Sequence, residues 1–326
     1  MHVAEQKFAT FLRSRPASLL LIVAGLVMTL AAPMLGLIPV LPDAGTSSAL
    51  IEFPFSLSVP SWATALMLLA VTAMMFHINR RYNLLRTTRI VYAGFFMLMC
   101  GAAPAPPTET VMSTLLAMVL LVSLALYYLL YNRPRDRRKV FLTGVILGSA
   151  VLLHRATILY LPVLILGLTQ MRIFSSRSLA ALIIGLLTPA WIAWAIFDVS
   201  FNFHISVWRE SPFVYFRHPS LWPAVASVVL TLLAGFVMGF MVLIKVLTLN
   251  ARARALNGLL TLMAVASGIF IIADFENLFF YLTALNCFVA FQIAHFFRLN
   301  RHRSSYISVT ILIIAYTAIY VCPLIL

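Results

Sequence analysis

The chain has 326 residues, of which 63% are hydrophobic and only 10% are charged. An ordinary soluble domain is about half apolar and about a quarter charged, so a soluble fold could not hide this much apolar surface. The net charge of +14 would suit a nucleic-acid partner, but the basic residues lie in short stretches between apolar runs. Retention of Lys and Arg on the cytoplasmic side explains such stretches, so we expect a membrane protein and no nucleic-acid binding.

Apolar runs follow one another along the whole chain, and most approach the roughly 20 residues that a membrane-spanning helix needs. The runs cover residues 17–40, 61–76, 90–103, 111–131, 140–153, 156–170, 178–197, 221–244, 255–273, 278–297 and 305–325. We therefore predict an all-α fold, a polytopic transmembrane helical bundle of about eleven hydrophobic segments. No polar stretch is long enough for a soluble domain, so residues 1–326 are predicted to form a single transmembrane domain.

The first run also has features of a cleavable signal peptide, namely a basic start and the small residues Ala31 and Ala32. Its apolar character continues through Leu37 and Ile38. We therefore expect a first span that is retained.

The basic residues predict the orientation. If the N-terminus is inside and the segments alternate, the inner loops hold 20 of the 23 Lys and Arg residues, and the outer loops hold only Arg155, Arg209 and Arg217. This asymmetry predicts a multi-pass membrane protein whose basic loops are cytoplasmic. Its N-terminus would be cytoplasmic and its C-terminus would lie on the outer side.

Two places depart from this regular pattern. The third run is short, and we expect Leu84 and Leu85 to extend it. The fifth and sixth runs are also short and are separated only by His154 and Arg155. Reading them as one helix would invert every later loop, so we predict a short helical hairpin. Glycines at G-x-x-x-G spacing, Gly144 with Gly148 and Gly235 with Gly239, favour close helix packing.

The His154–Arg155 pair is the first candidate site, because charge at membrane depth is expensive and usually faces a partner or a wet cavity. In one interpretation the pair binds an anion or a lipid headgroup on the outer side. In the other, Arg155 belongs to a turn whose charge is paired with Asp198 or Asp274. The sequence leaves both open.

The outer loop at 200–220 mixes charges with aromatic rings, and its basic residues are Arg209 and Arg217. A segment lying in the membrane interface has this composition, and so does the mouth of a lipid-binding cavity. Arg209 and Arg217 are therefore further candidate ligand-binding residues.

Outer carboxylates such as Asp43, Asp274 and Glu276 could act as a general base or hold a divalent metal, although such groups are more often simply solvated. The sequence has no phosphate-binding glycine loop, nucleophile elbow, H-E-x-x-H helix or dinucleotide fingerprint. We expect no cofactor and no metal site.

The stretch 79–197 carries two resemblances. Its sequences Asn-Arg-Arg-Tyr-Asn-Leu-Leu, Val-Tyr-Ala-Gly-Phe-Phe and Leu-Tyr-Leu-Pro-Val-Leu resemble uncharacterised multi-spanning inner-membrane proteins of Bacteroidetes. That resemblance implies a multi-pass protein of the bacterial inner membrane with a periplasmic C-terminus, and no particular activity. The paired short helices at 144–170, the basic loop at 172–177 and the span with Pro189 are similar to the core of multi-spanning (GT-C-like) glycosyltransferases that use lipid-linked sugars. That resemblance implies a catalytic acid in the first outer loop. Asp43 is the candidate, although the loop lacks an Asp-x-Asp or Glu-x-Asp pair.

Three functions follow from these observations. The leading prediction is a non-catalytic cell-envelope component that binds membrane lipid or another envelope membrane protein. The second is a transferase of lipid-linked sugars, or an inactive relative, with Asp43 as its catalytic residue. The third is a transporter, although no internal repeat is visible.

Overall fold

The computed structural model describes residues 3–39, 59–82, 84–85, 90–133, 135–197, 219–246, 251–300 and 303–325. Within these ranges the chain forms helices and no strands, which confirms the predicted all-α class. The helices are α1 (Val3–Leu12), α2 (Arg15–Ala31), α3 (Ser61–Tyr82), α4 (Val91–Ala102), α5 (Pro107–Leu130), α6 (Arg137–Leu153), η1 (Arg155–Leu159), α7 (Tyr160–Gln170), α8 (Ser176–Phe197), η2 (Pro219–Leu221), α10 (Trp222–Val246), α11 (Ala251–Ala273), η3 (Phe275–Asn277), α12 (Leu278–Leu299) and α13 (Arg303–Ile325).

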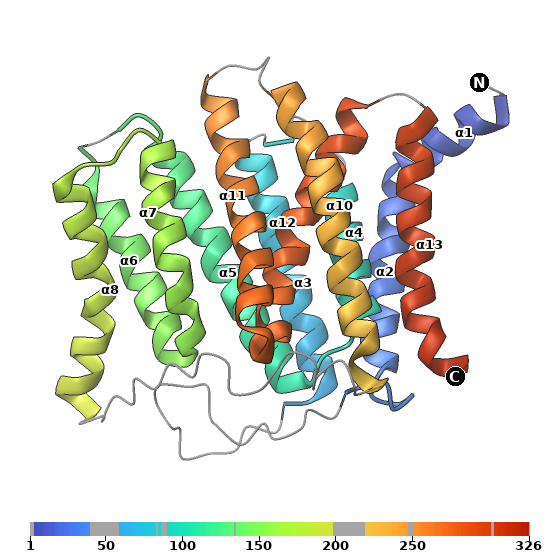
Figure 1. The fold of residues 1–326 in the computed structure, drawn as a ribbon, viewed down its shortest axis with the longest axis horizontal. Coiled ribbons are helices and arrows are strands. Elements are labelled where there is room, and N and C mark those ends of the chain that lie inside the picture. Colours follow the sequence, from blue (N-terminus) through green and yellow to red (C-terminus); the bar gives the residue numbers. More distant parts are fainter. Residues whose placement is uncertain are drawn as a thin grey trace.

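From α2 onward, successive helices run in opposite directions through one bundle (Figure 1). Within the described ranges, seven helical segments are long and apolar enough to cross a membrane. They are α3, α5, α8, α10, α11, η3 with α12, and α13. The segments α2, α4 and η1 with α7 are shorter and apolar. The chain is therefore an integral membrane protein with many passes.

The two ends of the bundle differ in charge. At one end lie the C-terminal ends of α3, α5, α7, α10 and α12 (Figure 1). The described basic residues there include Arg80, Arg81, Arg133, Arg135, Arg137, Arg138, Lys139, Arg172, Arg177, Lys245, Arg252, Arg254 and Arg298. We call it the basic end. The opposite end carries Glu109, Asp274 and Glu276, and Arg155 is its one basic residue in the described part of the chain.

Helix α12 is the centre of the bundle. Every residue of its apolar span is buried, and it packs against α4, α5, α10, α11 and α13. A helix that is hydrophobic on all sides belongs in an interior. By contrast α8 and α13 lie at the periphery (Figure 1) and expose apolar side chains such as Trp191 and Ile314, as lipid-facing helices do.

Glycines allow two pairs of helices to approach backbone to backbone. A Cβ added at Gly144 would collide with the Leu182 carbonyl oxygen, and one added at Gly148 would collide with that of Leu186. The expected close packing at Gly144 and Gly148 is therefore confirmed, and the partner is α8. On the other side of the bundle Gly25 of α2 packs against the backbone of α4.

Two predicted helix boundaries were wrong. Helix α2 ends at Ala31 instead of continuing toward residue 40, because Pro33 cannot donate a backbone hydrogen bond and clashes with the preceding turn. Leu84 and Leu85 do not extend α4, which begins at Val91. They form a buried turn, where the Leu85 N–H donates to the Asn79 side chain over 3.0 Å.

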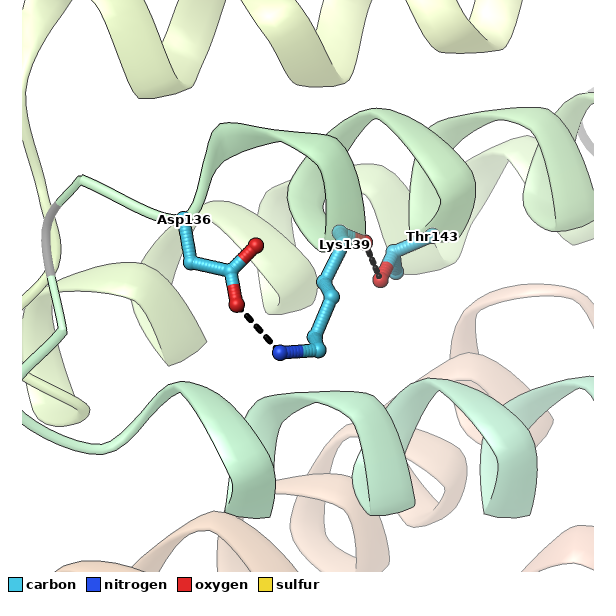
Figure 2. Close-up of polar contacts among 3 residues, drawn as sticks. All are labelled: Asp136, Lys139 and Thr143. Carbon is cyan, nitrogen blue, oxygen red and sulfur yellow. Dashed lines mark hydrogen bonds and ion pairs between the residues drawn. The ribbon is translucent and has the colours of Figure 1, made fainter.

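Helix α6 begins at Arg137, three residues before the predicted start. Its first turn carries three cations, which the helix dipole disfavours at an N-terminus. Figure 2 shows the compensation, since the Asp136 carboxylate just before the helix pairs with the Lys139 ammonium. The Thr143 hydroxyl then donates to the Lys139 carbonyl over 2.9 Å, which ties the first two turns together.

Candidate functional site

The predicted break between the fifth and sixth segments lies at His154. Its backbone is extended, with φ of −148° and ψ of 111°, so α6 ends there and η1 begins. The His154 N–H still donates to the Ala150 carbonyl over 2.9 Å, and the His154 carbonyl accepts from the Thr157 N–H over 3.1 Å. The chain reverses, as the hairpin prediction requires. The two arms then diverge, because α6 packs on α5 and α8 whereas α7 packs on α11.

The His154 ring is buried in this connection. It is 3% exposed and stacks on Phe280, with ring centroids 3.6 Å apart and an interplanar angle of 11°. Within the described chain neither ring nitrogen has a hydrogen-bond partner. Burial, with a smaller contribution from the neighbouring Arg155 charge, lowers the pKa of His154 to about 3. The imidazole is therefore neutral at physiological pH and offers no positive charge to an anion.

Arg155 lies close enough to Asp274 for its charge to act on that carboxylate. Burial raises the pKa of Asp274, and the nearby Glu276 charge adds to that rise. The hydrogen bonds from Asn277 and Tyr281 oppose it, with a smaller contribution from the Arg155 charge. The Tyr281 hydroxyl donates to the carboxylate over 2.9 Å, and the Asn277 amide donates to both of its oxygens. The Arg155 charge thus acts on Asp274, one of the two acidic partners considered above, whereas the other, Asp198, lies outside the described residues.

The other candidates from the sequence are not brought into this cluster. Asp43, Arg209 and Arg217 lie outside the described residues. In the part of the chain that is described, no group of three His, Cys, Asp or Glu residues could hold a metal ion.

A small polar cavity lies at the same end of the bundle, between α2, α3, α4, α5 and α12. Its volume is about 40 Å³, and its polar lining includes Thr29, Thr64, Thr110 and Asn286. This volume suits a few ordered water molecules. It is too small for a lipid chain.

A larger hollow, an apolar groove of about 430 Å³, lies between α10 and α11 and is floored by α12. Along α10 it extends from Leu232 to Leu243, roughly 16 Å at 1.5 Å per residue. Its walls are strongly exposed aliphatic and aromatic side chains, including Phe236, Phe240 and Ile269. We call it the α10–α11 groove. Its outer side chains belong to the surface that would face lipid.

Glycines open this groove. Gly235 and Gly239 of α10 lie against Val289 and Gln292 of α12, where an added Cβ at Gly239 would meet the Gln292 side chain at 3.0–3.2 Å. The sequence pointed to this glycine pair as a packing motif. It could not show that the pair lies against a polar residue of a distant helix, beside a hollow.

No protein-family model, curated protein or solved structure matches the chain. The two family resemblances stay predictions.

Proposed function

We propose that this protein is a non-catalytic component of the bacterial inner membrane that binds lipid in the α10–α11 groove. The observation that carries the proposal is the groove itself, which is apolar, about 430 Å³ in volume and walled by exposed side chains. This volume lies within the range of ligand pockets in proteins. The described polar groups that line it are the Thr261 hydroxyl and the Gln292 amide, and neither ionises near neutral pH.

A hollow of this shape holds a lipid more tightly than a flat helix surface does. Lipid tails are as apolar as the side chains that they touch, so the hydrophobic effect does not drive their association. Dispersion contacts do, and these grow with the number of atoms within about 4 Å. A chain lying between Phe236 and Ile269 is contacted from two walls and a floor, whereas a chain on the outer face of α8 is contacted from one side.

The proposed orientation places the basic end in the cytoplasm. The helix ends that carry Arg133 to Lys139, Arg172 and Arg177 all lie at this end (Figure 1), as cytoplasmic retention of basic residues requires. The N-terminus is then cytoplasmic and the C-terminus periplasmic. Another membrane protein that covers the groove is the competing occupant.

The test fills the groove with a larger side chain. Val265 lines the groove and is 53% exposed, whereas Val229 on α10 is 51% exposed and does not line it. Val265→Trp and Val229→Trp are therefore matched variants. Lipid that stays bound through detergent purification is measured by mass spectrometry. We expect Val265→Trp to lose bound lipid severalfold and Val229→Trp to retain the wild-type amount. Equal retention by the two variants would refute the groove as the lipid site.

A further inference from the structure

Gln292 lies on the floor of the α10–α11 groove, and among the described residues that line the groove it is the one with a buried polar atom that has no hydrogen-bond partner. The residue is 3% exposed, and its Oε1 atom has no hydrogen-bond partner within the described chain. Thr261, the other polar residue of the lining, already donates its hydroxyl to the Asn257 carbonyl over 3.0 Å. Leaving a buried acceptor without a partner costs free energy. A ligand that donates a hydrogen bond to Gln292 Oε1 would therefore bind more tightly than one that does not.

The position of Gln292 limits what the occupant can carry there. Gln292 lies seven residues before Leu299, the end of α12, which is roughly 10 Å below the basic end at 1.5 Å per residue. A charged group at such a depth in a bilayer is expensive unless it is paired. The side chains that line the groove include no charged residue, so nothing described there would pair with a charged headgroup.

A hydroxyl group meets both conditions. It is neutral, and it donates a hydrogen bond to a carbonyl oxygen. A methyl ether or an ester carbonyl accepts but does not donate, so it leaves Oε1 unpaired.

Gly239 and Gly235 let α10 lie directly against the Gln292 side chain at the floor of the groove. Both residues lie against α12, and any side chain at Gly239 would press against the Gln292 amide. A side chain at Gly239 would therefore cover the amide, and the glycine keeps it at the groove lining. The remaining wall residues, among them Leu232 and Ile272, are suited to an apolar chain.

We propose that the α10–α11 groove binds a neutral long-chain lipid through a hydroxyl group that is hydrogen-bonded to Gln292. The inference rests on the proposed lipid-binding function and names the chemistry of the ligand. A simple long-chain alcohol and a diacylglycerol both carry this group. A protein helix is the weaker occupant, because a helix is 10–12 Å across with its side chains and would need a much larger hollow over the same 16 Å.

The test compares probes that differ only in the hydroxyl. The purified full-length protein is equilibrated with phosphatidylcholine vesicles that contain hexadecanol, hexadecyl methyl ether, dipalmitoylglycerol or its acetate ester. Probe retained per protein is measured by mass spectrometry. We expect the wild type to favour each free hydroxyl over its blocked form by about tenfold, as one hydrogen bond to a buried group allows. A preference for the free hydroxyl in only one of the two pairs would support the proposal and show whether the ligand is a simple alcohol or a diacylglycerol.

A variant tests whether the preference for the hydroxyl depends on Gln292. Gln292→Met keeps the length of the side chain and removes the amide, so it should retain the blocked probes like the wild type and lose the preference for the hydroxyl. If this variant does not fold, the comparison of free and blocked probes on the wild-type protein still tests the hydroxyl inference. Equal retention of free and blocked probes by the wild type would overturn the hydroxyl inference and leave lipid binding intact. Retention of no probe, together with a self-associated protein that Val265→Trp renders monomeric, would overturn both proposals.

Discussion

Replacing His154 by Phe should remove a specific loss of stability at acid pH. In the unfolded chain the imidazole takes up a proton below its ordinary pKa of 6.5, whereas burial in the fold holds its pKa at about 3. The unfolded state therefore gains a proton that the folded state does not, and stability present above pH 6.5 is lost as the pH falls toward 3. The slope is about 1.4 kcal/mol per pH unit, so roughly 2 kcal/mol is lost at pH 5.

The assay is thermal unfolding of the purified protein at pH 7.5 and pH 5. Because a kcal/mol shifts the midpoint by roughly 2 °C in a large domain, the wild type should lose about 4 °C more than His154→Phe between the two pH values. Phe keeps the stacking on Phe280 and has no nitrogen to leave unpaired. Equal losses for wild type and His154→Phe would refute the neutral, buried imidazole.

Three further predictions concern packing, charge and orientation. Gly148→Ala should destabilise the protein by about 1–3 kcal/mol, because its methyl group overpacks the α6–α8 contact, whereas Ser149→Ala on the exposed face of α6 should change thermal stability little. Arg155→Ala should lower the thermal midpoint without changing the retention of anionic lipid measured by mass spectrometry, since its charge acts on Asp274; a loss of anionic lipid would instead make Arg155 a ligand-binding residue. Cysteine introduced at Ser220 should react with an impermeant thiol reagent in sealed cells and cysteine at Asn132 should not, and the reverse pattern would invert the proposed orientation.

Most of the architecture could be predicted from the sequence, because the length of an apolar run and the spacing of basic residues are local properties. The break at His154 was predicted for the same reason, since reading through it would have inverted the basic loops. The conformation of Leu84 and Leu85 could not be predicted from their local sequence. Their apolar side chains fitted a longer helix, but the turn is stabilised by Asn79 and by Arg298 of α12, which only the tertiary fold brings near.

The candidate site was less predictable. The neutrality of His154 depends on its burial against Phe280, a residue of a distant helix. The groove depends on Gly239 lying opposite Gln292, and in the sequence Gln292 is simply one polar residue in an apolar run. Such a residue inside a membrane helix is itself a signal for a partner, although it does not say whether the partner is protein or lipid.

The occupancy of the α10–α11 groove tests the account most directly. Electron cryo-microscopy of the protein in nanodiscs of its native lipids should show elongated density between α10 and α11, along Leu232 to Leu243, with a polar group within hydrogen-bonding distance of the Gln292 amide. A groove filled by the helix of a second protein, or closed by Phe236 and Phe240, would contradict the account.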